Sequence, residues 1–145
     1  MNRGINTSKE LYKEMKSLYN KEELKELTLE AAKSLKGKRI KTLYMGYMGQ
    51  DEVDNFIVGD VVSEYNYYLN CPSETEDRFP DEKGNKNLID YWKSRGFLDL
   101  IEESKKTLYL LDSDGYDTMF RLHAEEGNNT FTCSDVDRIV YYKEA

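Results

Sequence analysis

The sequence predicts an α+β fold in which an N-terminal helix, or a pair of helices, packs on a strongly bent antiparallel sheet of about six strands. Two observations favour this fold. Apolar residues recur at helical spacing in the first third, and short β-branched and aromatic runs separated by turn sequences fill most of the remainder. A helical insertion is expected between the second and third strands. The length of 145 residues fits a single domain over 1–145. Within it, we expect a helical segment over 1–37, a β-rich core over 38–145 and a loop and helix insertion over 70–106.

The N-terminal segment opens with a capping box at residues 7–10, where a threonine hydroxyl and a glutamate carboxylate would satisfy free backbone N–H groups. The apolar residues that follow at helical spacing are Leu11, Met15 and Leu18. A second capping sequence at Asn20 leaves open whether one long helix or two short helices continue over residues 24–35. Gly37 stands where a glycine commonly ends a helix.

Two strands are expected next, over residues 39–48 and 55–69, because both stretches are rich in β-branched and aromatic residues. The intervening GQDEVD is a plausible hairpin connection. Gly59 marks a point where the second strand would bend or bulge. The residues expected to share one side of the second strand are Val61, Tyr65, Tyr67 and Leu69.

A long loop is expected over residues 70–87, which contain both prolines and show no apolar period. Residues 88–106 then predict one helix broken near Gly96, or two short helices, capping an open end of the sheet. The remaining strands are expected over residues 107–112, 116–124, 130–133 and 138–142. The last two, joined by a tight corner at 134–137, resemble the ending of SH3-like barrels, and this resemblance implies a small barrel as the alternative to an open sheet.

The net charge of −7 is unevenly distributed. Residues 1–41 carry a balance of +5 and residues 42–145 a balance of −12. Between residues 50 and 82 there are ten acidic residues and one basic residue, Arg78. Such asymmetry bears on partners and solubility rather than on the fold.

We interpret this acidic, tyrosine-bearing tract as the surface of a non-catalytic protein-binding module. Its carboxylates would complement a basic protein surface, and tyrosine is favoured at interfaces. In size and charge the chain is similar to phage or mobile-element inhibitors that occupy the basic nucleic-acid-binding groove of a host nuclease or defence protein. The predicted partner-binding residues are Asp51, Glu52, Asp54, Asp60, Glu64, Tyr65, Tyr67, Tyr68, Glu74, Glu76 and Asp77. A solubilising loop is the competing interpretation.

The alternative function is a small metal-dependent hydrolase or ligand-binding enzyme built on an aspartate cluster, with His123 assisting. The candidate ligands are Asp112, Asp114, Asp117, Asp135 and Asp137. Against this, the DSDG sequence at residues 112–115 is a common hairpin signal, and Asp135 fits a turn. His123, the sole histidine, shares its strand side with Arg121 and is expected at the surface.

Several other classes are disfavoured. The lysines of the N-terminal segment are interleaved with glutamates, and the acidic remainder would repel a phosphate backbone, so the sequence disfavours nucleic acid as a partner. Cys71 and Cys133 have no metal-ligand spacing and are expected as free thiols. We expect no cofactor, no membrane span and a cytoplasmic location. A self-associating structural module is a third hypothesis, since the sequence leaves the oligomeric state open.

Overall fold

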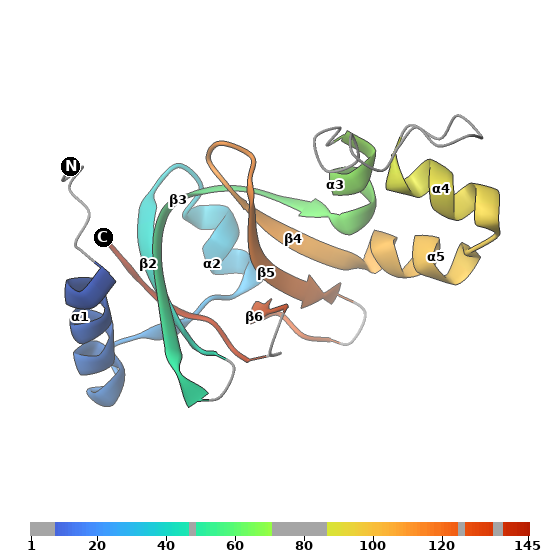
Figure 1. The fold of residues 1–145 in the computed structure, drawn as a ribbon. Coiled ribbons are helices and arrows are strands. Elements are labelled where there is room, and N and C mark those ends of the chain that lie inside the picture. Colours follow the sequence, from blue (N-terminus) through green and yellow to red (C-terminus); the bar gives the residue numbers. More distant parts are fainter. Residues whose placement is uncertain (1–7, 47–48, 71–86, 125–126, 135–137) are drawn as a thin grey trace.

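The computed structural model describes residues 8–46, 49–70, 87–124, 127–134 and 138–145 (Figure 1). It is an α+β fold with an N-terminal helix and an antiparallel sheet, as predicted. The helices are α1 (Ser8–Asn20), α2 (Leu29–Ser34), α3 (Glu64–Asn70), α4 (Leu88–Arg95) and α5 (Leu98–Lys106). The strands are β1 (Lys25–Glu26), β2 (Arg39–Met45), β3 (Asp51–Ser63), β4 (Thr107–Asp112), β5 (Asp117–His123), β6 (Thr132–Cys133) and β7 (Tyr141–Glu144).

The sheet has seven strands in the order β1-β7-β2-β3-β4-β5-β6 and is not closed. The last strand therefore lies between β1 and β2, not next to β6. Two isolated bridges, Thr28 to Thr130 and Thr132 to Ile139, connect segments that flank the sheet ends. The SH3-like barrel is not confirmed, and the short β1 is a seventh strand that the sequence pattern did not predict.

The long strand β3 joins the two halves of the sheet. Its first part pairs with β2, from Met45 opposite Asp51 to Arg39 opposite Ile57, and its last part pairs with β4. The register of β3 against β4 shifts between Val58 and Val61 of β3, so the bulge predicted at Gly59 is confirmed. At Gly59 the backbone passes so close to β4 that a Cβ would lie 2.0 Å from the carbonyl oxygen of Asp112.

The N-terminal segment forms two helices separated by β1 (Figure 1). The interpretation that residues 24–28 continue a helical face is wrong, because Lys25 and Glu26 pair with the last strand. The second helix begins instead at Leu29 and is capped by Thr28, whose hydroxyl accepts a hydrogen bond from the backbone N–H of Ala31 at 3.1 Å. The threonine of the predicted capping box, Thr7, lies outside the described residues.

The prediction that residues 55–69 form one strand is also wrong in its second half, where the chain turns into α3. The Ser63 hydroxyl accepts a hydrogen bond from the backbone N–H of Asn66 at 3.1 Å, which satisfies a donor at the start of the helix. Tyr65, Tyr67 and Leu69 consequently follow a helical surface and do not share one strand side. The final strand is shifted too, beginning at Tyr141.

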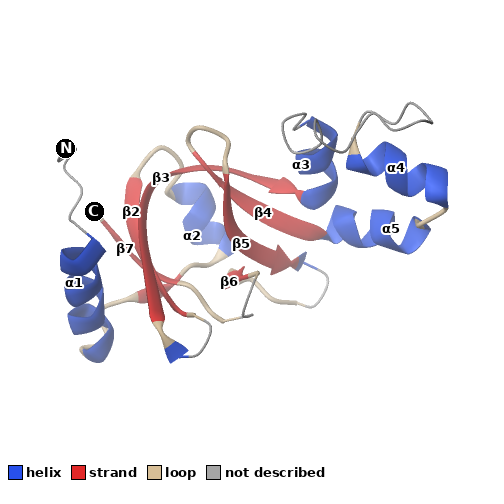
Figure 2. Ribbon diagram, in the orientation of Figure 1, coloured by secondary structure: helices blue, strands red, loops and turns tan. Residues whose placement is uncertain are grey.

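The main core lies between the sheet and α2 and includes Ile40, Phe56, Leu110, Phe120 and Phe131. A second cluster joins α1 to the sheet through Leu11, Met15 and Leu43. Helices α3, α4 and α5 pack at the end of the sheet farthest from α1 (Figure 2). Gly96, in the left-handed conformation, separates α4 from α5, so the predicted break is confirmed as two helices. No helix among the described residues is long and apolar enough to cross a membrane.

Candidate functional site

Three of the predicted partner-binding carboxylates have partners within the chain. Asp51 forms an ion pair with Lys16 at 2.6 Å, and Asp60 pairs with Lys36. The hydrogen bond to Asp51 raises the pKa of Lys16 above its ordinary value. Glu64 accepts a hydrogen bond from the Tyr109 hydroxyl at 2.5 Å. These contacts offset part of the negative field that the sequence pattern suggested.

The remaining predicted carboxylates divide into two groups. Glu52 and Asp54 lie on β3 and are exposed. Desolvation by the surrounding protein raises the pKa of Asp54, the backbone N–H of Asn55 lowers it, and the nearby charge of Asp112 raises it further. The others, Glu74, Glu76 and Asp77, lie outside the described residues.

The three predicted tyrosines lie on α3 and contribute mainly to packing. Tyr67 is buried against Tyr109, with ring centroids 5.2 Å apart. Tyr68 makes edge contacts with both Tyr109 and Trp92 at 6.1 Å. The amine of Lys105 lies 5.3 Å from the ring centroid of Tyr65. The structure thus brings Tyr67 and Tyr68 together with Tyr109 and Trp92 as an aromatic cluster between α3, α4 and β4.

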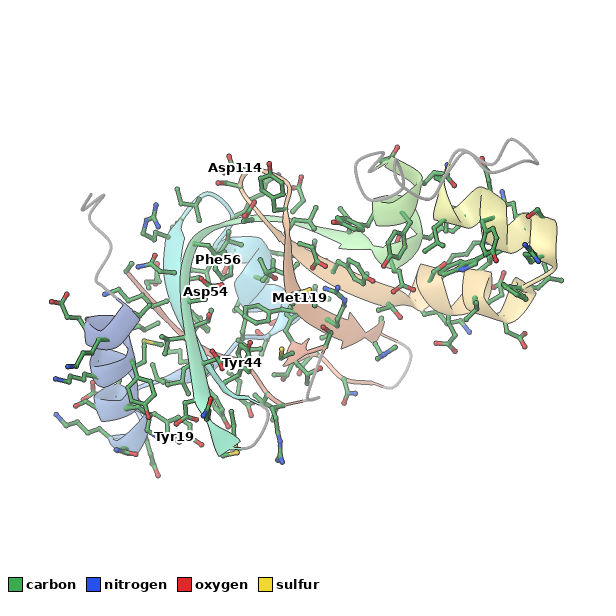
Figure 3. The ribbon with its side chains drawn as sticks, in the orientation of Figure 1. Tyr19, Tyr44, Asp54, Phe56, Asp114 and Met119 are labelled. Carbon is green, nitrogen blue, oxygen red and sulfur yellow. The ribbon has the colours of Figure 1, made fainter. Side chains whose placement is uncertain are left out.

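A different acidic group involves the turn between β4 and β5, where Asp112, Asp114 and Tyr116 lie, and Asp54 of β3, whose pKa responds to the charge of Asp112. We call Asp54, Asp112, Asp114 and Tyr116 the hairpin patch. One carboxylate oxygen of Asp112 accepts hydrogen bonds from the backbone N–H groups of Asp114 at 2.9 Å and Tyr116 at 3.0 Å. This confirms the predicted hairpin turn. Asp114 lies at its tip (Figure 3), and Tyr116 is 71% exposed.

The predicted aspartate cluster for a metal ion does not assemble in the described part of the chain. Asp117 accepts two hydrogen bonds from Arg121, each 2.6 Å long. Asp112 holds the turn, and Asp135 and Asp137 lie outside the described residues. Among residues 8–46, 49–70, 87–124, 127–134 and 138–145, no group of three or more His, Cys, Asp or Glu side chains is arranged to hold a metal.

A polar cavity of about 690 Å³ lies where β4, β5 and β6 meet α3 and α5. Tyr109 and Arg121 contribute to its wall, with the guanidinium carbon 3.3 Å from the tyrosine ring centroid. Burial, followed by hydrogen bonds to Glu64 and Tyr68, raises the pKa of Tyr109. Burial acts to lower the pKa of Arg121, but the hydrogen bonds to Asp117 raise it above its ordinary value.

His123, Thr107 and Cys133 also line this cavity. His123 is exposed, as predicted, and its Nδ1 lies 3.2 Å from the hydroxyl oxygen of Thr107. That hydroxyl also donates to the backbone carbonyl of Glu103 at 3.1 Å. Cys133 is a buried free thiol that lines the cavity as well. Cys71, predicted as the other free thiol, lies outside the described residues.

The cavity was not predicted from the sequence because its walls come from separate elements. Glu103 lies near the end of α5, Thr107 and Tyr109 lie on β4, and Arg121 lies on β5. One feature of the sequence pointed toward it. Arg121 and His123 are two positions apart on one strand, so both polar side chains lie on the same side of the sheet. No family model matches the chain, and no curated protein or solved structure matches it either.

Proposed function

We propose that the chain is a non-catalytic module that binds a basic protein surface. The observation that carries this proposal is the hairpin patch. Asp112 and Asp114 lie together at the hairpin with the exposed Tyr116, and the charge of Asp112 also acts on Asp54 of β3. Opposite charge speeds encounter with a basic partner, and an exposed tyrosine supplies rigid contact area. The patch combines residues that the sequence pattern had assigned to two separate functions.

The finer proposal is that this surface competes with nucleic acid for the groove of a nuclease or defence protein. It rests on charge, because carboxylates presented to lysines and arginines substitute for phosphates. Glu52, on the same strand as Asp54, adds an exposed carboxylate nearby in sequence.

The test compares capture from an extract rich in nucleases by the wild-type chain and by the triple variant Asp54→Asn, Asp114→Asn, Tyr116→Ser. Asp112 is kept because its carboxylate holds the turn. The control variant, Glu30→Gln, Asp99→Asn, Tyr12→Ser, removes the same number of charges and one exposed tyrosine elsewhere.

We expect one basic protein to be captured at low salt and released by high salt or competing DNA. The triple variant should bind it roughly tenfold more weakly, given about 0.2–1 kcal/mol per exposed charge pair and more for an aromatic anchor. The control should bind like the wild type. Equal binding by both variants, or capture that DNA does not displace, would contradict the proposal.

A further inference from the structure

We propose that the polar cavity is a binding site for an organic cation, a guanidinium or primary ammonium group with several N–H donors. The inference goes beyond the proposed function because none of the hairpin patch residues lines the cavity. It rests on three observations: the balance of charge in the wall, the arrangement of hydrogen-bond acceptors, and the volume.

The charge balance favours a cation. Glu64 and Glu103 both line the cavity, and among the described lining residues Arg121 is the one with a fixed positive charge. That charge is already matched by Asp117, with side-chain exposures of only 14% and 16% for the pair. Arg121 is further held by its stacking on Tyr109. The two glutamates therefore leave the cavity with excess negative charge.

The hydrogen bonds at Thr107 indicate which ring nitrogen of His123 is available as a hydrogen-bond acceptor. The threonine hydroxyl has one hydrogen, and the Glu103 carbonyl can only accept. Both contacts of Thr107 are satisfied together when its hydroxyl donates to the carbonyl and His123 Nδ1–H donates to Oγ1. In this tautomer the lone pair of His123 is on Nε2, which then offers an acceptor to a ligand.

The carboxylate of Glu64 supplies further acceptor capacity. An ionised carboxylate has about four lone-pair sites, and the Tyr109 hydroxyl occupies one of them. Glu64, Glu103 and His123 thus bring residues with acceptor groups from α3, α5 and β5 to the wall of one cavity. A ligand rich in N–H donors satisfies this arrangement, whereas an anion would face two carboxylates and an arginine whose charge Asp117 already balances.

The volume is sufficient for such a ligand. About 690 Å³ falls within the roughly 300–1,000 Å³ typical of small-ligand sites. A basic amino-acid side chain and a free polyamine share the required chemistry, so the experiment separates these two sources.

The first experiment titrates the wild-type protein with N-acetyl-arginine amide, its neutral isostere N-acetyl-citrulline amide, spermidine and inorganic phosphate. Binding is followed by calorimetry and by backbone amide NMR. Saturable binding of either cation, with shifts concentrated at Glu103, Thr107, Arg121 and His123 and much weaker binding of the citrulline compound, would support the site. Binding of the arginine compound alone indicates a side chain as the natural ligand, and binding of spermidine alone indicates a free polyamine.

The second experiment uses the variant Glu64→Gln, Glu103→Gln, in which the new amide oxygen on α3 still accepts a hydrogen bond from Tyr109. The control Glu102→Gln, Asp99→Asn removes two charges from α5 at positions that do not line the cavity. We expect the cavity variant to bind the cation at least roughly fivefold more weakly and the control to bind normally. The proposal is overturned if no cation binds, if citrulline binds equally well, if phosphate is the preferred ligand, or if the cavity variant retains full affinity.

Discussion

Single residues acquire their chemistry here from partners that are distant in sequence. The Tyr109 hydroxyl donates to Glu64, which is 45 positions earlier, and its ring stacks against the Arg121 guanidinium. Burial and these hydrogen bonds raise the pKa of Tyr109, so the phenol stays protonated and acts as a donor. Nothing local to "TLYLLD" indicates this role, since the sequence there is typical only of a buried strand.

Asp54 gives a prediction at this scale, because desolvation and Asp112 raise its pKa above the ordinary 3.8. A carboxyl with a raised folded-state pKa binds its proton more tightly in the folded state. Its contribution to stability therefore falls as pH rises from 3.8 through the raised value. Asp54→Asn keeps an acceptor for the N–H of Asn55 and, because solvent screens this exposed side chain, should raise the free energy of unfolding at pH 7 by only about 0.5 kcal/mol.

This gain should disappear near pH ~3, where the aspartate is largely protonated in both states. Urea unfolding at the two pH values measures it, with Glu52→Gln as a control at an exposed position on the same strand. A loss of stability at pH 7, or a gain of equal size at both pH values, would contradict the assignment.

At the scale of elements, the end of β3 shows how a local hydrogen bond overrides strand propensity. The run from Val61 to Leu69 contains valines and tyrosines that favour strands. Yet Ser63 caps the following turn, and Tyr67 reaches a buried position against Tyr109 from a helix. The β-propensity of these residues reflects packing, and here the helix provides better packing.

The prediction at the scale of elements concerns the stability of a variant at Gly59. The close approach of β3 to the Asp112 carbonyl leaves no space for a Cβ, so Gly59→Ala should lower the free energy of unfolding by at least about 3 kcal/mol or prevent folding. Gly115→Ala is the matched control. Its Cβ would meet nothing within 4 Å, and the cost should be about 1 kcal/mol, from the positive φ of 86°.

Denaturant unfolding followed by circular dichroism compares the two glycine variants. Similar stabilities for Gly59→Ala and Gly115→Ala would show that β3 and β4 can separate locally without cost, contrary to the expected rigid crossing.

At the scale of the whole molecule, the arrangement places α1 and the group of α3, α4 and α5 at opposite ends of the sheet (Figure 1). β3 spans the distance between these ends, since it contacts α1, β2, β4, α3 and α5. Because the two ends share this strand, we expect them to unfold together. One domain over residues 1–145 stays a prediction.

Two probes test this single-domain prediction. Trp92, the only tryptophan, lies on α4 beside Tyr68, and Cys133 is 1% exposed in β6. In a Cys71→Ser background, Trp92 fluorescence and thiol labelling of Cys133 should report the same midpoint in urea. A Trp92 transition at clearly lower urea would show instead that the helical end unfolds independently.

Local signals predicted much of the fold correctly. Helical spacing indicated α1, DSDG the hairpin between β4 and β5, Gly59 the bulge and Gly96 the break between α4 and α5. Each depends on residues close together in the chain, where propensity and turn chemistry act directly. The position of β7 between β1 and β2 was not accessible in this way, because strand order depends on contacts between the two ends of the chain.

By itself, the sequence determined the α+β class, the uneven charge and most element positions, since these follow from composition and short-range pattern. Only the tertiary structure decided which charges remain available. It paired Asp51 with Lys16 and Asp60 with Lys36, and it placed Glu64 and Glu103 on the wall of one polar cavity. Electrostatic and hydrogen-bond energies depend on distances between side chains, and those distances are set by how the sheet and helices pack.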